Sequence, residues 1–438
     1  MSNNQTSASN TPSATGYKNR WVQLIIGIFC MGLVANLQYG WTLFVTPMDN
    51  AHHWGKAAIQ LAFSIFIVTE TWLVPIEGYL VDKFGPRPVV AGGAICAGLG
   101  WVLNSYATSL PMLYTAAVIS GIGAGCVYGT CVGNALKWFP DRRGLAAGLT
   151  AAGFGAGAAI TVIPIANMIK ASGYEHTFFT FGIIQGVLIF IAALLLVKPV
   201  APKGAVGART VATKVDYTTK QMLKTPVFWI LYAMFVLVSS GGLMAVAQLG
   251  PIATDYGFAA LPMTLFGATL PLLTMTLSID NVANGLTRPL CGFISDKIGR
   301  ENTMFIVFIG EGLALLGLMQ FGHNPVAFMF FAAMVFLCWG EIFSIFPAIC
   351  GDTFGSKFAA GNAGTLYTAK GTSALLVPLG SALAVGGNWN RVFIVAAVVT
   401  IIAGVSAKFI LQPMRLRMIA KGAATVAATE ESGQRVAA

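Results

Sequence analysis

Long apolar stretches alternate with short polar connections along almost the whole chain. A helix that spans a bilayer needs roughly 20 predominantly apolar residues, and about twelve stretches reach that length. The pattern therefore predicts an all-α membrane protein with twelve transmembrane helices. The expected helices cover residues 21–45, 57–81, 89–107, 112–136, 144–169, 178–197, 227–249, 270–294, 303–321, 326–350, 359–384 and 392–411.

The composition excludes the water-soluble classes of protein. The chain has 438 residues, of which 56% are apolar and 10% are charged, whereas soluble domains carry about 25% charged residues. The formal charge of +10 could suit a nucleic acid, but on one side of the predicted membrane the connections and tails hold 20 Lys and Arg, against three on the other side. Basic loops face the cytoplasm. We therefore expect both termini in the cytoplasm, a lipid bilayer as partner and no nucleic acid.

A basic connection divides the chain into two halves. Residues 198–225 carry six Lys and Arg, and we expect them to form a cytoplasmic linker. They separate a six-helix half at 18–197 from a second six-helix half at 226–416. The tails 1–17 and 417–438 are expected to be disordered, and the first lacks the apolar core of a cleaved signal peptide.

Each half carries the same short motif after its second helix. GYLVDKFGPR follows the second expected helix and GFISDKIGR follows the eighth. Glycine lets helices approach closely, and an Asp with basic neighbours can form ion pairs that lock the cytoplasmic ends of the halves together. We expect two pseudo-symmetric halves with a cargo site near the midplane of the membrane. The motif residues are Gly78, Asp82, Lys83, Arg87, Gly292, Asp296, Lys297 and Arg300.

Two cations lie inside apolar stretches, Arg288 in the eighth and Lys370 in the eleventh. An Arg in hydrocarbon costs between about 2.5 and about 17 kcal/mol, so it is retained where it faces a partner or an aqueous cavity. Arg binds a carboxylate in a bidentate manner, and Lys acts as a point charge. We expect both to bind a small anion in one central cavity, facing each other from opposite halves. Without cargo their charges would repel, which favours exchange over one-way flux.

Acidic residues inside the membrane offer a second explanation for the cations. Asp280 and Asn284 lie eight and four residues before Arg288, on roughly the same helix face, so a local partner without any cargo exists. Glu341 could neutralise Lys370 in a buried ion pair. Glu70 lies deep in the second helix and could serve as the proton site of a proton-coupled carrier.

Seven cysteines lie within or at the edges of apolar stretches, with no C-x-x-C pair and no His at ligand spacing. We interpret them as small buried side chains. The sequence predicts no metal site and no cofactor. It also contains no nucleophile–base set, so an enzyme is not expected.

The repeated motif resembles the signature of the major facilitator superfamily, and the resemblance implies that fold for essentially the whole chain. Within this superfamily the chain is most similar to the oxalate/formate antiporters. The stretches that carry this likeness include Asn36-Leu-Gln38-Tyr39-Gly-Trp41, Lys137-Trp-Phe-Pro-Asp-Arg-Arg-Gly, Asn284-Gly-Leu-Thr-Arg288-Pro, Trp339-Gly-Glu341-Ile-Phe343 and Leu366-Tyr367-Thr-Ala-Lys370.

The resemblance implies that Arg288 and Lys370 bind a dicarboxylate inside a pocket of aromatic and amide groups. Without the resemblance, the aromatic residues of this pocket would be interpreted as ordinary residues of the hydrophobic core. Asp280 and Glu341 are departures from the best-known member of the family, and so are three of the pocket positions, where that member has Tyr or Trp: Phe154, Phe343 and Tyr367. The complete set of implied pocket residues is Gln38, Tyr39, Tyr128, Phe154, Trp339, Phe343 and Tyr367.

The resemblance further implies a secondary antiporter of a bacterial inner membrane. It would import oxalate and export formate by alternating access, as a monomer, and exchange of a dianion for a monoanion would be electrogenic. The nearest alternative is a proton-coupled monocarboxylate transporter of the same superfamily, with Glu70 or Glu341 as proton acceptor. A membrane sensor is disfavoured because the chain contains no soluble signalling domain.

Overall fold

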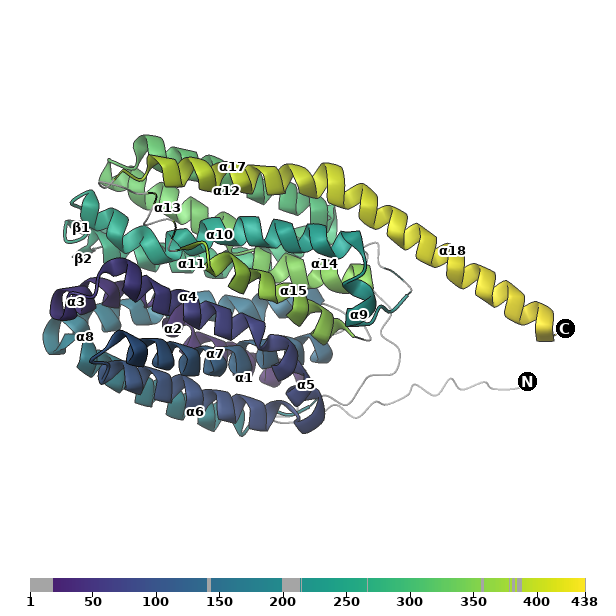
Figure 1. The fold of residues 1–438 in the computed structure, drawn as a ribbon, viewed down its shortest axis with the longest axis horizontal. Coiled ribbons are helices and arrows are strands. Elements are labelled where there is room, and N and C mark those ends of the chain that lie inside the picture. Colours follow the sequence, from purple (N-terminus) through teal and green to yellow (C-terminus); the bar gives the residue numbers. More distant parts are fainter. Residues whose placement is uncertain are drawn as a thin grey trace, which may run out of the picture.

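The computed structural model describes residues 19–139, 143–198, 213, 215–265, 267–355, 358–377, 379, 383 and 388–437. These residues form a bundle of long helices that run side by side, with a two-stranded hairpin at one end (Figure 1). We call that end the hairpin end. The opposite end, where the short helix α9 (Thr219–Met222) lies, is the α9 end.

The first half of the chain forms one side of the bundle, in purple to blue in Figure 1. Its helices are α1 (Arg20–Val34), α2 (Asn36–Tyr39), α3 (Thr42–His52), α4 (Lys56–Trp72), α5 (Val74–Phe84), α6 (Pro86–Ser105), α7 (Leu110–Trp138) and α8 (Arg143–Ala193).

The second half, in teal to yellow, forms the other side. After α9, its elements are α10 (Pro226–Asp255), β1 (Pro262–Leu265), β2 (Ala268–Pro271), α11 (Leu272–Ile298), α12 (Arg300–Phe321), α13 (Pro325–Trp339), α14 (Ile342–Phe354), α15 (Ala359–Ala374), α17 (Asn390–Ser406), the π-helical turn η3 (Ala407–Leu411) and α18 (Gln412–Ala437).

Nine helical segments of the described chain are long and apolar enough to cross a membrane. One of these segments, within the 51-residue helix α8, contains two expected spans. The two spans are separated at Gly173, where φ is 84° and the helix is broken. The helices α11 and α15 fall outside the nine, α11 because it carries many polar residues and α15 because it ends after 16 residues. When α8 is counted as two spans and α11 and α15 are added, each of the twelve expected spans corresponds to a helix of the structure.

Three spans are interrupted near the middle of the bundle. The first span is divided into α1, the four-residue helix α2 and α3, and α2 carries Gln38 and Tyr39. The second breaks at Leu73, and the tenth breaks between Trp339 and Ile342. Irregular backbone at membrane depth is tolerated where it is buried in protein or lines a cavity, so these breaks mark the centre of the molecule as a special region.

Two sets of helices join the halves: α8 packs on α11, while α4 and α5 pack on α15. Glycines bring these backbones together. A Cβ atom added at Gly155 would lie 2.6 Å from the Cα atom of Gly285, and one added at Gly292 would lie 3.1 Å from the carbonyl oxygen of Gly144. Any larger side chain at these positions would push the halves apart.

The close approach expected at the two motif glycines occurs at one of them. Gly292 contacts α8, whereas a Cβ atom at Gly78 would meet no described atom within 4 Å. The expectation for Gly78 is therefore wrong in this conformation. The second half of the chain, through Gly292, supplies the close contact between the two sides of the bundle.

The start of the eighth span and the all-helical expectation need a small correction. Residues 262–271 form the antiparallel hairpin β1–β2, in which Met263 pairs with Leu270. Its turn contains Gly267 with φ 81°, a conformation that glycine adopts at no steric cost. The span therefore begins at Leu272 and not at residue 270.

The C-terminal tail differs from the expected disorder. Residues 417–437 continue α18 as a helix that projects from the α9 end of the bundle (Figure 1). Alanine has the highest helix propensity, and this segment is rich in it. The expected N-terminal tail 1–17 and most of the linker 198–225 lie outside the described residues.

A substitution tests the glycine packing inside the first half. A Cβ atom at Gly157 would lie 2.0 Å from the carbonyl oxygen of Gly32 on α1. Overpacking of this kind costs about 1–3 kcal/mol, so Gly157→Ala should lower the melting temperature of the detergent-solubilised protein by several degrees. Gly133→Ala is the matched control, because no described atom lies within 4 Å of the added Cβ atom there. Equal melting temperatures for the two variants would contradict the packing.

Candidate functional site

Arg288 lies in the middle of α11 with a side chain that is 1% exposed. Its Nη1 donates to the carbonyl oxygen of Ala151 at 2.8 Å. Its Nη2 donates to the hydroxyl of Tyr39 at 2.9 Å and to the side-chain oxygen of Asn284 at 2.6 Å. Two of these partners, Tyr39 and Ala151, belong to the first half, so the guanidinium connects the halves.

Lys370 lies on α15 and is also 1% exposed. Its Nζ donates to Gln38 Oε1 at 2.8 Å, to Glu70 Oε2 at 2.8 Å and to the hydroxyl of Tyr367 at 3.2 Å. Gln38 and Glu70 come from the first half, on α2 and α4. The ammonium group therefore connects the halves in the same way as the guanidinium.

The two cations share one aromatic ring. Phe343, on α14, has the Arg288 guanidinium carbon 4.6 Å and the Lys370 Nζ 5.4 Å from its ring centroid. The ammonium also lies 5.9 Å from the rings of both Tyr128 and Phe154. Cations at such distances from aromatic faces are attracted by the ring quadrupole. The prediction that both cations line one central region agrees with this geometry.

The aromatic residues form a continuous cage around the cations. Tyr128 stacks on Tyr367 with centroids 5.0 Å apart and meets Phe154 edge-on at 5.6 Å. Phe343 lies 5.2 Å from Trp339 and 6.2 Å from Tyr367. All nine pocket residues implied by the sequence thus gather in one place, and none of them is more than 6% exposed.

The halves touch on both sides of this cage. Towards the hairpin end, Gln60 Nε2 donates to the carbonyl oxygen of Ala247 at 2.7 Å and Ser64 Oγ donates to that of Ala374 at 2.9 Å. Towards the α9 end, Trp72 Nε1 donates to the carbonyl oxygen of Thr368 at 3.1 Å, and α8 meets Gly292. The structure therefore represents a conformation in which the site is closed at both ends of the bundle.

The two cations do not come from opposite halves, which corrects the expectation. Arg288 and Lys370 both belong to the second half, as the boundaries of the expected spans already imply. The first half contributes hydrogen-bond acceptors and aromatic rings instead. The bridge between the halves is therefore made by cations on one side and their acceptors on the other.

Lys370 is neutralised by Glu70 and not by Glu341, which corrects a second expectation. The side chains of the Lys370–Glu70 pair are 1% and 0% exposed. Neither carboxyl oxygen of Glu341 has a hydrogen-bond partner among the described residues. The supposed repulsion between two unpaired cations in the empty site is also wrong for Lys370, because Glu70 supplies the opposite charge.

Asn284, and not Asp280, is the local partner of Arg288. The carboxyl oxygens of Asp280 have no partner among the described residues. The side-chain oxygen of Asn284 accepts from both Arg288 and Tyr39, which fixes the orientation of the guanidinium. The sequence indicated this contact, because Asn284 lies four residues before Arg288 and residues i and i+4 share a helix face.

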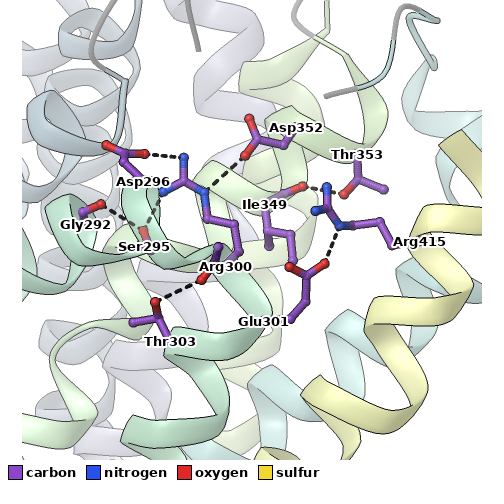
Figure 2. Close-up of polar contacts among 11 residues, drawn as sticks. Gly292, Ser295, Asp296, Arg300, Glu301, Thr303, Ile349, Asp352, Thr353 and Arg415 are labelled. Carbon is purple, nitrogen blue, oxygen red and sulfur yellow. Dashed lines mark hydrogen bonds and ion pairs between the residues drawn. The ribbon is translucent and has the colours of Figure 1, made fainter. Parts of the chain in front are cut away.

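The repeated motif of the second half lies at the α9 end, in a network of ion pairs around the buried Arg300. Figure 2 shows Arg300 between Asp296 and Asp352, with nitrogen–oxygen distances of 2.6 and 3.1 Å, and Arg415 beside Glu301 at 2.6 Å. Asp296 and Arg300 were predicted to take part. Glu301 and Arg415 were missed, because they lie 114 residues apart and no local pattern connects them.

The ion pairs that the described residues form in this network join helices of the second half. The expected ion pairs between the halves stay a prediction, because the side chains of Asp82 and of residues 141–143 lie outside the described part of the structure. The contact with the first half is made by the Asp296 carboxylate, which lies against the start of α8: a Cβ atom at Gly144 would be 3.1 Å from its Oδ2. A carboxylate at a helix N-terminus is favoured by the helix dipole. The contact between the halves is thus one between a charge and a helix end.

The remaining motif cations are exposed. Lys83 lies over the ring of Phe84 at 5.2 Å, and Lys297 lies over the ring of Phe293 at 4.3 Å. Arg87 is exposed at the start of α6. The side chain of Asp82 is outside the described part of the structure, so its expected role stays a prediction.

A bundle of spanning helices around two buried cations and a cluster of aromatic rings is typical of a multi-pass membrane transporter. The family description of the Major Facilitator Superfamily matches residues 24–279 and 258–429. The chain belongs to the Major Facilitator Superfamily, and within it to the oxalate/formate antiporter family.

Three relatives illustrate the relationship. The chain is 37% identical over 402 residues to the oxalate:formate antiporter of Oxalobacter formigenes, which covers 90% of this chain and 92% of that protein. It is 26% identical to the uncharacterized MFS-type transporter YhjX of Escherichia coli strain K12, over 82% and 86% of the two chains. It is 26% identical to the human monocarboxylate transporter 11, over 62% and 56%.

The buried pair Glu301–Arg415 provides a test of the network at the α9 end. Removing one partner of a buried ion pair typically costs about 3–5 kcal/mol. Glu301→Gln should therefore lower the melting temperature of the detergent-solubilised protein clearly. Lys297→Gln removes an exposed charge at the same end and should leave the melting temperature within about one degree, because exposed ionic contacts contribute about 0–1 kcal/mol. If Glu301→Gln melts like Lys297→Gln, the pair does not stabilise the closed bundle.

Proposed function

We propose that this protein is a secondary carrier that exchanges small carboxylate anions, importing oxalate and exporting formate, by alternating access between its two halves. The observation that supports this most directly is the position of Arg288 and Lys370, both buried and both within 5.4 Å of the centroid of the Phe343 ring. The relative from Oxalobacter formigenes adds independent support through its name.

The chemistry of the chamber suits a small, flat anion. A guanidinium has five N–H donors, and Arg288 uses three of them in the contacts described above. Its Nε has no partner among the described residues, so a carboxylate can still be bound. The second carboxylate of oxalate would reach Lys370. Formate would use Arg288 alone, while the aromatic cage would exclude bulkier anions.

Cargo binding would change the contacts between the halves. In this structure, Tyr39 and Gln38 of the first half accept hydrogen bonds from the two cations. An anion that enters must take over some of these donors. This exchange of partners gives the cargo a differential effect on the open and closed states, which any ligand-driven conformational change requires.

A proton-coupled monocarboxylate carrier is the second candidate function. The ion pair between Glu70 and Lys370 favours it, because a carboxylate inside the membrane is a natural proton acceptor. The human relative named as a monocarboxylate transporter points in the same direction. Uptake of labelled formate driven by an imposed pH gradient, with no anion inside the vesicles, would favour this candidate over exchange.

For the cellular setting, we propose the inner membrane of a bacterium, with both termini in the cytoplasm and the monomer as the working unit. The distribution of 20 against three basic residues supports this orientation. It would place the α9 end, with the network around Arg300, on the cytoplasmic side.

Counterflow of labelled oxalate into proteoliposomes loaded with formate tests the leading proposal. Arg288→Gln and Lys370→Gln should each lose exchange by more than about tenfold, because truncating a buried charged contact costs about 2–5 kcal/mol. Arg288→Lys should also be impaired, since it keeps the charge and loses the planar fork.

Arg391→Gln is the control for these variants, because it removes an exposed positive charge at the start of α17, outside both the site and the repeated motif. It should exchange at the wild-type rate. The assignment of the site would be wrong if Arg288→Gln, Lys370→Gln and Arg288→Lys all exchanged as fast as this control.

A further inference from the structure

The chamber contains one carboxylate that the proposed exchange does not use. Glu70 lies in the last turn of α4, is fully buried, and its Oε2 contacts the Nζ of Lys370 at 2.8 Å. It comes from the first half and reaches the same ammonium group that is expected to hold one end of a dianion. An acidic side chain next to an anion-binding cation is unfavourable for a second negative charge.

The fixed charges of the chamber therefore add up to one positive charge. Arg288 and Lys370 contribute two, and Glu70 removes one. Asp280 and Glu341 are fully buried with no bonding partner among the described residues, so neither pairs with a cation of the site. A monoanion would make the loaded chamber neutral, whereas a dianion would leave it with a negative charge in the membrane.

The donors of Lys370 lead to the same conclusion. An ammonium group has three N–H donors, and all three are used, by Gln38, Glu70 and Tyr367. A second cargo carboxylate can bind Lys370 only if one of these acceptors leaves. Protonation of Glu70 would weaken its hold on the ammonium and remove the repulsion between the two carboxylates.

We propose that Glu70 sets the charge of the cargo: a monoanion binds to the chamber as it stands, and a dianion binds together with one proton that Glu70 holds. This inference rests on the proposed function, because it assigns the charge state of the same site. Import of oxalate with one proton, against export of formate, would then move no net charge. The electrogenic exchange implied by resemblance would require a chamber without Glu70.

The surroundings of Glu70 are buried and close-packed. The backbone of α4 lies against the glycines of α7, where a Cβ atom at Gly125 would be 2.5 Å from the Glu70 carbonyl oxygen and 2.7 Å from Glu77 Oε1. The carboxyl oxygens of Glu77 have no partner among the described residues. The titratable groups that face Glu70 or lie within its electrostatic reach are Tyr39 on α2, Glu77 on α5, Tyr128 on α7, and Tyr367 and Lys370 on α15.

The test measures anion binding by purified protein as thermal stabilisation over a concentration series of formate or oxalate. Between about pH 6 and about pH 8 both anions are fully ionised. For wild type, the dissociation constant of oxalate should rise about tenfold per pH unit, because one proton is bound with each dianion. The dissociation constant of formate should stay constant over the same range.

Glu70→Gln should bind oxalate with a dissociation constant that does not change with pH. Glu311→Gln is the matched control: it makes the same change from carboxyl to amide at another fully buried position, and it should keep the wild-type slope for oxalate. A constant dissociation constant for oxalate in wild type, or an unchanged slope in Glu70→Gln, would overturn the proposal.

If Glu70→Gln fails to fold, counterflow of oxalate against formate by the wild type is measured under an imposed membrane potential. A rate that is independent of the potential supports the proposal, and a rate that follows the potential overturns it. Binding with the expected slope but without counterflow would reject only the proposed exchange. Counterflow without the slope would reject only the role of Glu70, and binding of neither anion would reject both.

Discussion

The cost of holding Arg288 and Lys370 in the middle of a membrane-spanning bundle governs the structure around them. In a region without bulk water, the N–H donors of each cation need hydrogen-bond acceptors, and its positive charge needs to be balanced. The second half of the chain carries both cations, and the first half supplies most of what satisfies them: the Ala151 carbonyl, Tyr39, Gln38 and Glu70. The halves are thus held together at their centre by polar contacts that the proposed cargo would have to replace.

The same cost explains why the sequence alone located the site. A cation in an apolar stretch is rare enough to be informative, and the resemblance to antiporters supplied the aromatic residues that no periodicity would have separated from an ordinary core. The two helices that carry the cations, α11 and α15, are also the ones that fall outside the nine clearly apolar segments. For α11 the reason is its polar residues, so weak hydropathy marks this helix as one that contributes to the site.

The partners of the cations were harder to predict, for a geometrical reason. Sequence spacing gives the depth and the face of a residue on its own helix, which was sufficient for Asn284 and Arg288. It does not give the rotation and register between helices of different halves. Those depend on contacts such as Gly155 against Gly285, so Glu70 across the interface could not be preferred over Glu341 from the sequence.

The helix breaks connect the chemistry of the chamber to movement. Glu70 lies three residues before the break at Leu73, Tyr39 ends the isolated α2, and Trp339 ends α13. At each break the backbone can bend without breaking further helical hydrogen bonds. Discontinuous helices also surround the cargo in other carriers. The groups that would sense the charge of the cargo are therefore placed where the spans are most easily bent, and the rigid glycine-packed pair α8–α11 is left to keep the two halves in register.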